Sequence, residues 1–256
     1  MNTILNTFLF NEKNHNPEKQ LYFAVLFFFI TVVALGLDSS YFSNNYFDGK
    51  PITNILAVVY FSLFFFYSDS KLRRLMFVMV FLSYIGELIF CNLLGMYDYR
   101  LGFIPLYVPL GHAIVYASGY VFAHTEWALR NDKLLKKQFA IGFIVLFLSV
   151  GVFLNDLFSL IFGVFFFLLL KRKKWQNLYY FIAICVIFIE LFGTYFQCWK
   201  WVPKTFGVIP AVNPPMGAVF FYAGGDVLLV KIIDYWKFKR NKNLINGNTK
   251  NQFEYK

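Results

Sequence analysis

The sequence predicts an all-α, polytopic integral membrane protein of about eight transmembrane helices, in two four-helix repeats of parallel orientation. Three observations support this fold class. Hydrophobic residues make up 59% of the chain, and charged residues only 15%, against about 25% in soluble domains. Apolar stretches long enough to cross a bilayer recur along the chain. Finally, two distant stretches have nearly the same order of residues.

The helices are expected where apolar runs reach membrane-spanning length, because a hydrocarbon core about 30 Å thick requires roughly 17–25 helical residues. We expect spans at residues 20–37, 52–67, 75–96, 103–123, 138–154, 157–170, 177–196 and 213–235. Residues 138–170 are interrupted only by Asn155 and Asp156. That run is too long for one ordinary span, which favours two helices in a tight hairpin. A re-entrant pair is the alternative.

Basic residues predict how the helices are oriented. Under the eight-span arrangement, one side of the membrane carries 19 Lys and Arg residues and the other side four. The positive-inside rule then places both termini and the loop 171–174 in the cytoplasm, with the chain in the cell inner (cytoplasmic) membrane. Attraction to anionic membrane lipid accounts for the formal charge of +10, so no nucleic acid partner is predicted.

The internal repeat divides the chain. The first copy contains Glu87, Tyr97-Asp98-Tyr99, Gly102-Phe103-Ile104-Pro105, Pro109, Gly111 and Tyr116; the second contains Glu190, Trp199-Lys200-Trp201, Gly207-Val208-Ile209-Pro210, Pro214, Gly217 and Tyr222. We therefore predict a four-helix repeat at residues 1–123, a cytoplasmic linker at 124–137, a second repeat at 138–236 and a disordered basic cytoplasmic tail at 237–256. Glu87 should overlie Glu190.

Polar residues inside apolar spans indicate a candidate site. Glu87 and Glu190 lie about 13–15 Å from the aromatic ends of their spans at helical rise, near mid-membrane. An ionised side chain there costs at least about 2.5–3.5 kcal/mol, so such residues are often functional. We predict that the catalytic residues Glu87, Glu190, His112 and Asp226 line one pocket in the outer half of the membrane. A carboxyl there is suited to general acid catalysis. In the competing interpretation, neutral acids only join neighbouring helices.

Aromatic and polar residues around these groups are predicted to bind substrate. Tyr116 and Tyr222 lie one helical turn from His112 and Asp226, within i,i+4 reach. The other predicted substrate-binding residues are Tyr97, Tyr99, Trp199 and Trp201 near the mouth of the pocket, and Asn213 at a proline-broken helix entry. The four aromatic residues at the mouth also fit an interfacial belt.

Other sites are not indicated. The chain has no His-rich cluster, no HExxH and no glycine-rich phosphate loop. Its three cysteines lack CxxC spacing. We therefore predict neither a metal nor a cofactor.

One segment resembles a known family. A Glu in a helix, an aromatic-x-Tyr connection and the run Ile-Pro-Leu-Tyr-Val-Pro-Leu-Gly at 104–111 resemble the bacterial carotenoid hydratases over about 30 residues of each repeat. The resemblance implies addition of water to an isoprenoid double bond. The residue chemistry is compatible with that reaction, because protonation of an alkene needs a carboxylic acid in a dry pocket with aromatic faces.

Three function classes remain open. The favoured one is an intramembrane enzyme of lyase, hydratase or isomerase type that acts on a lipid or isoprenoid, a hydrophobic small-molecule substrate. A small-solute or proton-coupled transporter is the second, although the inner halves of the spans offer few polar groups for a path. A non-catalytic membrane assembly or lipid-binding protein is the third.

Overall fold

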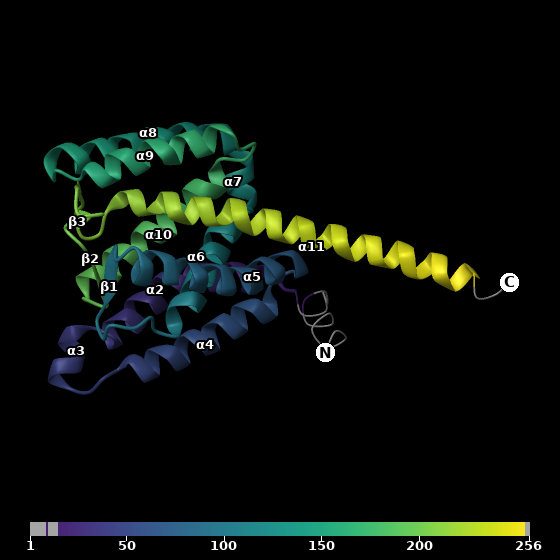
Figure 1. Ribbon diagram of the computed structural model, residues 1–256, viewed down its shortest axis with the longest axis horizontal. Coiled ribbons are helices and arrows are strands. Elements are labelled where there is room, and N and C mark those ends of the chain that lie inside the picture. Colours follow the sequence, from purple (N-terminus) through teal and green to yellow (C-terminus); the bar gives the residue numbers. More distant parts are fainter. Residues whose placement is uncertain (1–8, 10–14, 254–256) are drawn as a thin grey trace.

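The computed structural model of the protein describes residue 9 and residues 15–253, with side-chain surroundings through residue 236. The described residues form ten α-helices, one π-helix, one 3₁₀-helix and four short strands (Figure 1). The α-helices are α2 (Pro17–Leu37), α3 (Ser40–Asn45), α4 (Lys50–Tyr67), α5 (Ser70–Glu87), α6 (Tyr107–Ala123), α7 (Glu126–Arg130), α8 (Asp132–Phe153), α9 (Leu157–Lys171), α10 (Asn177–Tyr195) and α11 (Val219–Phe253). The π-helix η1 (Leu88–Leu93) follows α5, and the 3₁₀-helix η2 (Met216–Ala218) precedes α11.

Six helices are long and apolar enough to cross a membrane. They are α2, α4, α5 with η1, α8, α10 and the stretch Met216–Trp236 of η2 and α11. This confirms a multi-pass helical membrane protein. The other two predicted spans, α6 and α9, are also helices, but with 17 and 15 residues they are shorter than the rest. At helical rise they cover about 26 Å and 23 Å, less than the hydrocarbon thickness.

Helix α6 is the centre of the bundle. Thirteen of its 17 residues are buried, and it contacts α2, α4, α5 and α10. Gly119 allows α10 to approach closely, because a Cβ there would lie 2.7 Å from the Cα of Ile182. Because most of its surface faces protein instead of lipid, the bundle can accommodate a short helix that contains His112 and several small residues.

The segment 138–170 forms the predicted helical hairpin. Helix α8 ends at Phe153, Asn155 has a positive φ of 53°, and α9 begins at Leu157. The Asp156 carboxylate caps α9 by accepting from the Ser159 N–H at 3.0 Å. The two helices lie side by side in Figure 1 and contact each other. The turn chemistry of Asn-Asp therefore ends one helix and starts the next.

Strands connect the two distant stretches of similar sequence. Strand β1 (Tyr97–Tyr99) pairs antiparallel with β2 (Trp199–Trp201), and the register places Tyr97 opposite Trp201 and Tyr99 opposite Trp199. The aromatic residues are buried, and Asp98 and Lys200 between them are exposed. A second pair, β3 (Lys204–Thr205) and β4 (Ile209–Pro210), follows. We predicted no strands, although the alternation Tyr-Asp-Tyr and Trp-Lys-Trp is a strand pattern.

Helix α11 differs from its sequence-based expectation. We expected a disordered tail from residue 237, but α11 continues to Phe253, as Figure 1 shows in yellow. No proline follows Pro215 in the chain, so no residue of the tail is incompatible with a helix.

Candidate functional site

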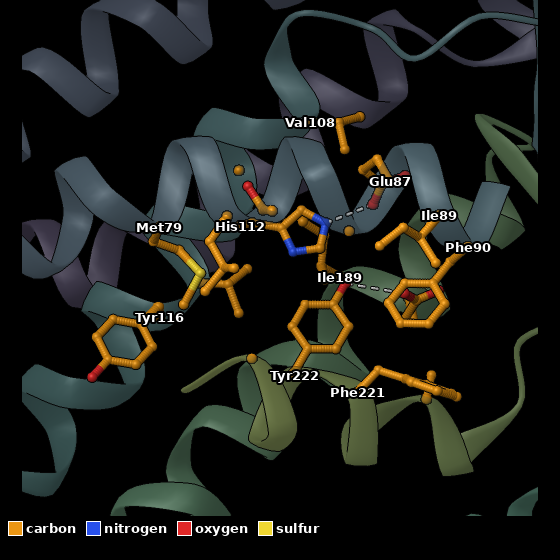
Figure 2. Close-up of a pocket in the computed structure, with 18 of the residues that line it drawn as sticks. Met79, Glu87, Ile89, Phe90, Val108, His112, Tyr116, Ile189, Phe221 and Tyr222 are labelled. Atoms are coloured by element: carbon orange, nitrogen blue, oxygen red, sulfur yellow. Dashed lines mark hydrogen bonds and ion pairs between the residues drawn. The ribbon is translucent and has the colours of Figure 1, made fainter. Parts of the chain in front are cut away.

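A cavity of about 360 Å³ lies next to the β1–β2 sheet. Its walls come from α5, η1, α6, α10, η2, α11 and the two strands (Figure 2). Nine of the eleven predicted site residues line it: Glu87, Tyr97, Tyr99, His112, Tyr116, Glu190, Trp199, Trp201 and Tyr222. The structure therefore brings together side chains that are more than 100 residues apart in the sequence.

Glu87 is held by three polar groups. Its side chain is at the C-terminal end of α5 and is 3% exposed. The Oε2 atom accepts hydrogen bonds from the hydroxyls of Tyr97 at 2.9 Å and Tyr99 at 2.7 Å. The Oε1 atom lies 2.9 Å from Nε2 of His112. Burial raises the pKa of both tyrosines well above the usual value, so their hydroxyls stay protonated and donate.

Glu190 is held in a parallel way by different donors. Its Oε2 atom accepts from the indole N–H groups of Trp199 at 2.9 Å and Trp201 at 3.0 Å. The Tyr222 hydroxyl donates to Oε1 at 3.3 Å. Gly193 on the same helix is required here, because a Cβ would lie 1.9 Å from the Trp199 ring. Each acid is thus hydrogen-bonded by both aromatic residues of one short strand and by one residue of a following helix.

The two acid clusters meet at His112 and Tyr222. Their rings stack with centroids 4.9 Å apart and an interplanar angle of 13°. Figure 2 shows the imidazole between Glu87 and the Tyr222 ring, and the Tyr222 hydroxyl is hydrogen-bonded to Glu190. Glu87, His112, Tyr222 and Glu190 therefore form one continuous row along the cavity.

The hydrogen-bond donors around each acid determine which of its carboxyl oxygens can carry a proton. An indole N–H only donates, so the two tryptophans favour an unprotonated Oε2 on Glu190. A proton on Glu190 would then be on Oε1, on the side that faces Tyr222. On Glu87 the corresponding position is Oε1, next to His112. Which of Oε1 and the Nε2 atom of His112 donates in this hydrogen bond depends on the tautomer of the imidazole.

The four strand aromatics are buried inside the protein, whereas the residues of an interfacial belt face the boundary between lipid and water. Tyr97, Tyr99, Trp199 and Trp201 are only 5–8% exposed and direct their polar atoms to the two acids. They form a wall of the cavity and orient its carboxyls. We expected them only near its mouth, because sequence spacing gives their distance along the chain and not the direction of the side chains.

Asp226 and Asn213 are not among the residues that line the cavity. Asp226 is one turn beyond Tyr222 on α11 and is 1% exposed. It lies next to the hydroxyls of Tyr116 and Tyr179, but neither of its carboxyl oxygens has a hydrogen bond of good geometry. The predicted i,i+4 contact with Tyr222 does not form, because that hydroxyl is bonded to Glu190.

Asn213 and Tyr116 make other contacts than the sequence predicts. The Asn213 side chain accepts from the backbone N–H of Trp201 at 2.9 Å and so fixes β2. Tyr116 lines the cavity, but its hydroxyl points away from His112 in Figure 2. Asn213 therefore supports the wall instead of lining it, and its role in substrate binding stays a prediction.

Several cavity residues were not predicted from the sequence. They include Met79, Leu82, Phe90, Gly111, Phe221, Gly224, Gly225 and Leu228. The adjacent pair Gly224-Gly225 is the one signal that the sequence offered, since glycine inside a helix is unfavourable by about 1 kcal/mol against alanine.

The described part of the chain contains no group of three or more His, Cys, Asp or Glu side chains arranged to hold a metal ion. Cys91, Cys185 and Cys198 are free. Comparisons with protein-family models, with curated proteins and with solved structures found no match to this chain.

Proposed function

We propose that the protein is an integral membrane enzyme that uses an intramembrane carboxylic acid as general acid on a lipid or isoprenoid substrate. The observation that carries this proposal is the row Glu87, His112, Tyr222 and Glu190 along one cavity with otherwise mainly apolar walls. Two buried acids next to one apolar space supply the proton donor and the dry environment that protonation of a carbon–carbon double bond requires.

The proposed step transfers one proton. The acid donates the proton from Oε1 to one alkene carbon, a C–H bond forms, and the adjacent carbon becomes a cation. Aromatic faces of the wall, such as those of Trp201 and Tyr97, stabilise the positive charge. Water then adds to the cation and releases a proton, or the cation loses a proton to the carboxylate. The first outcome is hydration and the second is isomerisation; both regenerate the acid.

His112 and Tyr222 have complementary positions in this scheme. His112 is hydrogen-bonded through Nε2 to Oε1 of Glu87, and the Tyr222 hydroxyl donates to Oε1 of Glu190. Their stacked rings bring the two acid clusters together. We assign both side chains to orientation of the acids and to proton return after the reaction.

The lining also favours an enzyme over a carrier. A carrier needs a polar route to both faces of the membrane. From the acids toward Met79 and Leu228, the cavity is lined mainly by apolar residues. We retain transport and non-catalytic lipid binding as outcomes that the experiment below distinguishes.

The proposal also includes the two repeats and their orientation in the membrane. Two four-helix repeats of parallel orientation, with both termini cytoplasmic, would place the two acids at equivalent positions of each half. The matching donor pattern around Glu87 and Glu190 supports this arrangement, as does the pairing of β1 with β2. The cavity would then lie in the outer half of the cytoplasmic membrane.

The test compares lipid and pigment content in cells that express wild type, Glu87→Gln or Glu190→Gln at equal protein level. Glutamine keeps the shape, and its carbonyl oxygen can accept from the two strand aromatics, but it has no acidic proton. Glu126→Gln is the matched control, because Glu126 is exposed on α7 and pairs only with Arg130 in the structure. We expect cells with wild type or Glu126→Gln to contain the product. Cells with Glu87→Gln or Glu190→Gln should lack it. Profiles identical to a strain without the gene in all four cases would contradict the enzyme and favour transport or lipid binding.

A further inference from the structure

Two groups of glycines in the membrane helices differ in their surroundings. Gly119, Gly151, Gly163 and Gly193 are each needed for close packing, because an added Cβ would lie less than 3 Å from a neighbour. Gly111, Gly142, Gly224 and Gly225 have nothing within 4 Å of that position. Close packing therefore does not explain the second group.

Three of these four open glycines line the cavity. They are Gly111 on α6 and the adjacent pair Gly224 and Gly225 on α11. Gly142 does not line the cavity; it lies exposed on α8. Each helical glycine is unfavourable by about 1 kcal/mol relative to alanine, so space at this site is maintained against helix propensity. The shared property of the three glycines is that side chains in their place would fill the cavity.

The cavity is elongated along the helices. Its lining residues recur at helical spacing on α5, from Met79 through Ser83 to Glu87, and on α11, from Tyr222 through Gly225 to Leu228. Eight residues of α5 correspond to about 12 Å at helical rise. The polar groups that face it gather at the end near Glu87 and Glu190, and the other end is mainly apolar.

One wall of the cavity is continuous with the outer surface of the bundle. The lining includes Ile85 and Ile89 near the end of α5 and Leu228 on α11, and these side chains are 54%, 40% and 49% exposed. Helices α5 and α11 contact each other, and each carries an exposed residue that lines the cavity. On a membrane-spanning helix, an exposed apolar surface faces lipid. The π-helix that begins at Leu88 lies at this border, and π-bulges often occur at functional sites.

We infer that the cavity has a lateral opening to the bilayer between α5 and α11, through which it takes an uncharged, long-chain hydrocarbon substrate such as an isoprenoid. The reacting part lies at Glu87 and Glu190, and the chain runs past Gly225 toward Met79 and Leu228. A volume of about 360 Å³ is at the lower end of the roughly 300–1,000 Å³ typical for small-ligand sites, so the remainder of a long chain extends into lipid. The inference rests on the proposed function, because it specifies the substrate class of the same site.

Photolabelling in membranes tests this opening directly. The probe is a short isoprenoid alcohol that carries a diazirine, added to membranes that contain the full-length protein; labelled peptides are identified by mass spectrometry. We expect labelling concentrated in residues 79–93 and 219–230. We expect Gly225→Leu to reduce it by about tenfold, equivalent to about 1.4 kcal/mol of binding free energy. Gly142→Leu, the matched glycine on α8, keeps wild-type labelling.

A second pair of variants probes the opening itself. Ile89→Trp places a bulky ring at the border and is expected to slow labelling of the interior, whereas Val145→Trp, on the exposed surface of α8, does not. Equal labelling in wild type, Gly225→Leu and Ile89→Trp, or labels spread evenly over all lipid-facing helices, would overturn the inference. Protection by a charged, water-soluble solute instead of an unlabelled isoprenoid alcohol would also overturn it.

The acid variants separate this inference from the proposed function. Glu87→Gln and Glu190→Gln are expected to retain local labelling, because they preserve the shape of the cavity. If they retain labelling and no expressed variant changes the lipid profile, the opening stands and the enzymatic function fails. If the lipid profile depends on both acids but labelling is unaffected by Gly225→Leu, the enzyme stands and the lateral route fails.

Discussion

Tyr97 and Trp201 lie opposite each other across the β1–β2 sheet, with ring centroids 4.7 Å apart, and they donate to different acids. The Tyr97 hydroxyl binds Glu87, and the Trp201 indole N–H binds Glu190. A single cross-strand pair thereby fixes the relative orientation of two carboxyls from helices α5 and α10. The sheet is short, but it couples the two halves of the site.

Loss of one indole donor should weaken this coupling. Trp201→Phe keeps an aromatic ring and removes the N–H that binds Oε2 of Glu190. We expect a loss of about 1 kcal/mol or more, because a buried acceptor loses a partner. Thermal denaturation in detergent measures the effect. Trp127→Phe, at a site that is 61% exposed, is the control; equal melting temperatures for the two variants would contradict the role of Trp201.

His112→Phe tests the link between the acids. Phenylalanine can preserve the stack on Tyr222 but has no atom to share a proton with Glu87. We expect product formation to fall by about 10²–10⁴-fold, the usual contribution of a positioned acid or base, while probe labelling of the cavity persists. The comparison variant is His124→Phe, outside the cavity. A lipid profile equal to that of wild type would remove His112 from the mechanism.

Asp156 offers a test that depends on pH. Burial raises the pKa of this carboxyl at the start of α9, so folding favours its protonated form. Stability from this group is therefore present at low pH and is lost as pH rises from about 4 through the folded pKa. Asp156→Asn keeps an oxygen to accept from the Ser159 N–H and carries no charge. We expect this variant to be at least as stable as wild type at neutral pH.

The pH profile and a second variant complete that test. The advantage of Asp156→Asn should shrink as pH falls toward 4, measured as melting temperature across a pH series. Asp156→Ala should lose about 0.5–2 kcal/mol, the usual cost of removing a helix cap. A lower stability of the asparagine variant at neutral pH would show that the hydrogen bonds to the charged carboxylate outweigh its burial.

Asp226 should be unfavourable for stability. It is almost fully buried, and neither carboxyl oxygen has a well-oriented hydrogen bond. Burial of such a group costs about 1–3 kcal/mol, so Asp226→Asn is expected to raise the melting temperature in detergent. Asp98→Asn, at an exposed position in β1, controls for the loss of charge. A marked destabilisation by Asp226→Asn would show that Asp226 has a partner essential to the fold.

Orientation in the membrane is the last prediction. The distribution of 19 basic residues against four predicts that residues 171–174 face the cytoplasm. A single cysteine placed in this loop, in a chain with Cys91, Cys185 and Cys198 replaced, should be protected from an impermeant thiol reagent in intact cells. A cysteine at Lys200, between the strand tryptophans, should react. The reverse pattern would invert the proposed topology.

Local features of the sequence were sufficient to predict the membrane class, the helical hairpin at Asn155-Asp156 and the polar and aromatic residues that hold the two acids. These features act over short distances: apolar length determines whether a helix can cross the bilayer, and an Asn-Asp turn ends one helix and caps the next. Placing an ionisable side chain inside an apolar segment costs free energy, and for this reason Glu87, His112 and Glu190 were candidates from the sequence alone.

Only the tertiary structure decided how these residues meet. The pairing of Tyr97 with Trp201 joins segments far apart in the chain, and long-range strand register is not encoded in either segment alone. Asp226 follows Tyr222 by one turn, yet Tyr222 binds Glu190 while Asp226 lies beside Tyr116 and Tyr179 outside the cavity lining. Helical spacing gives the depth of a side chain, whereas the rotation of the helix against its neighbours determines what that side chain faces.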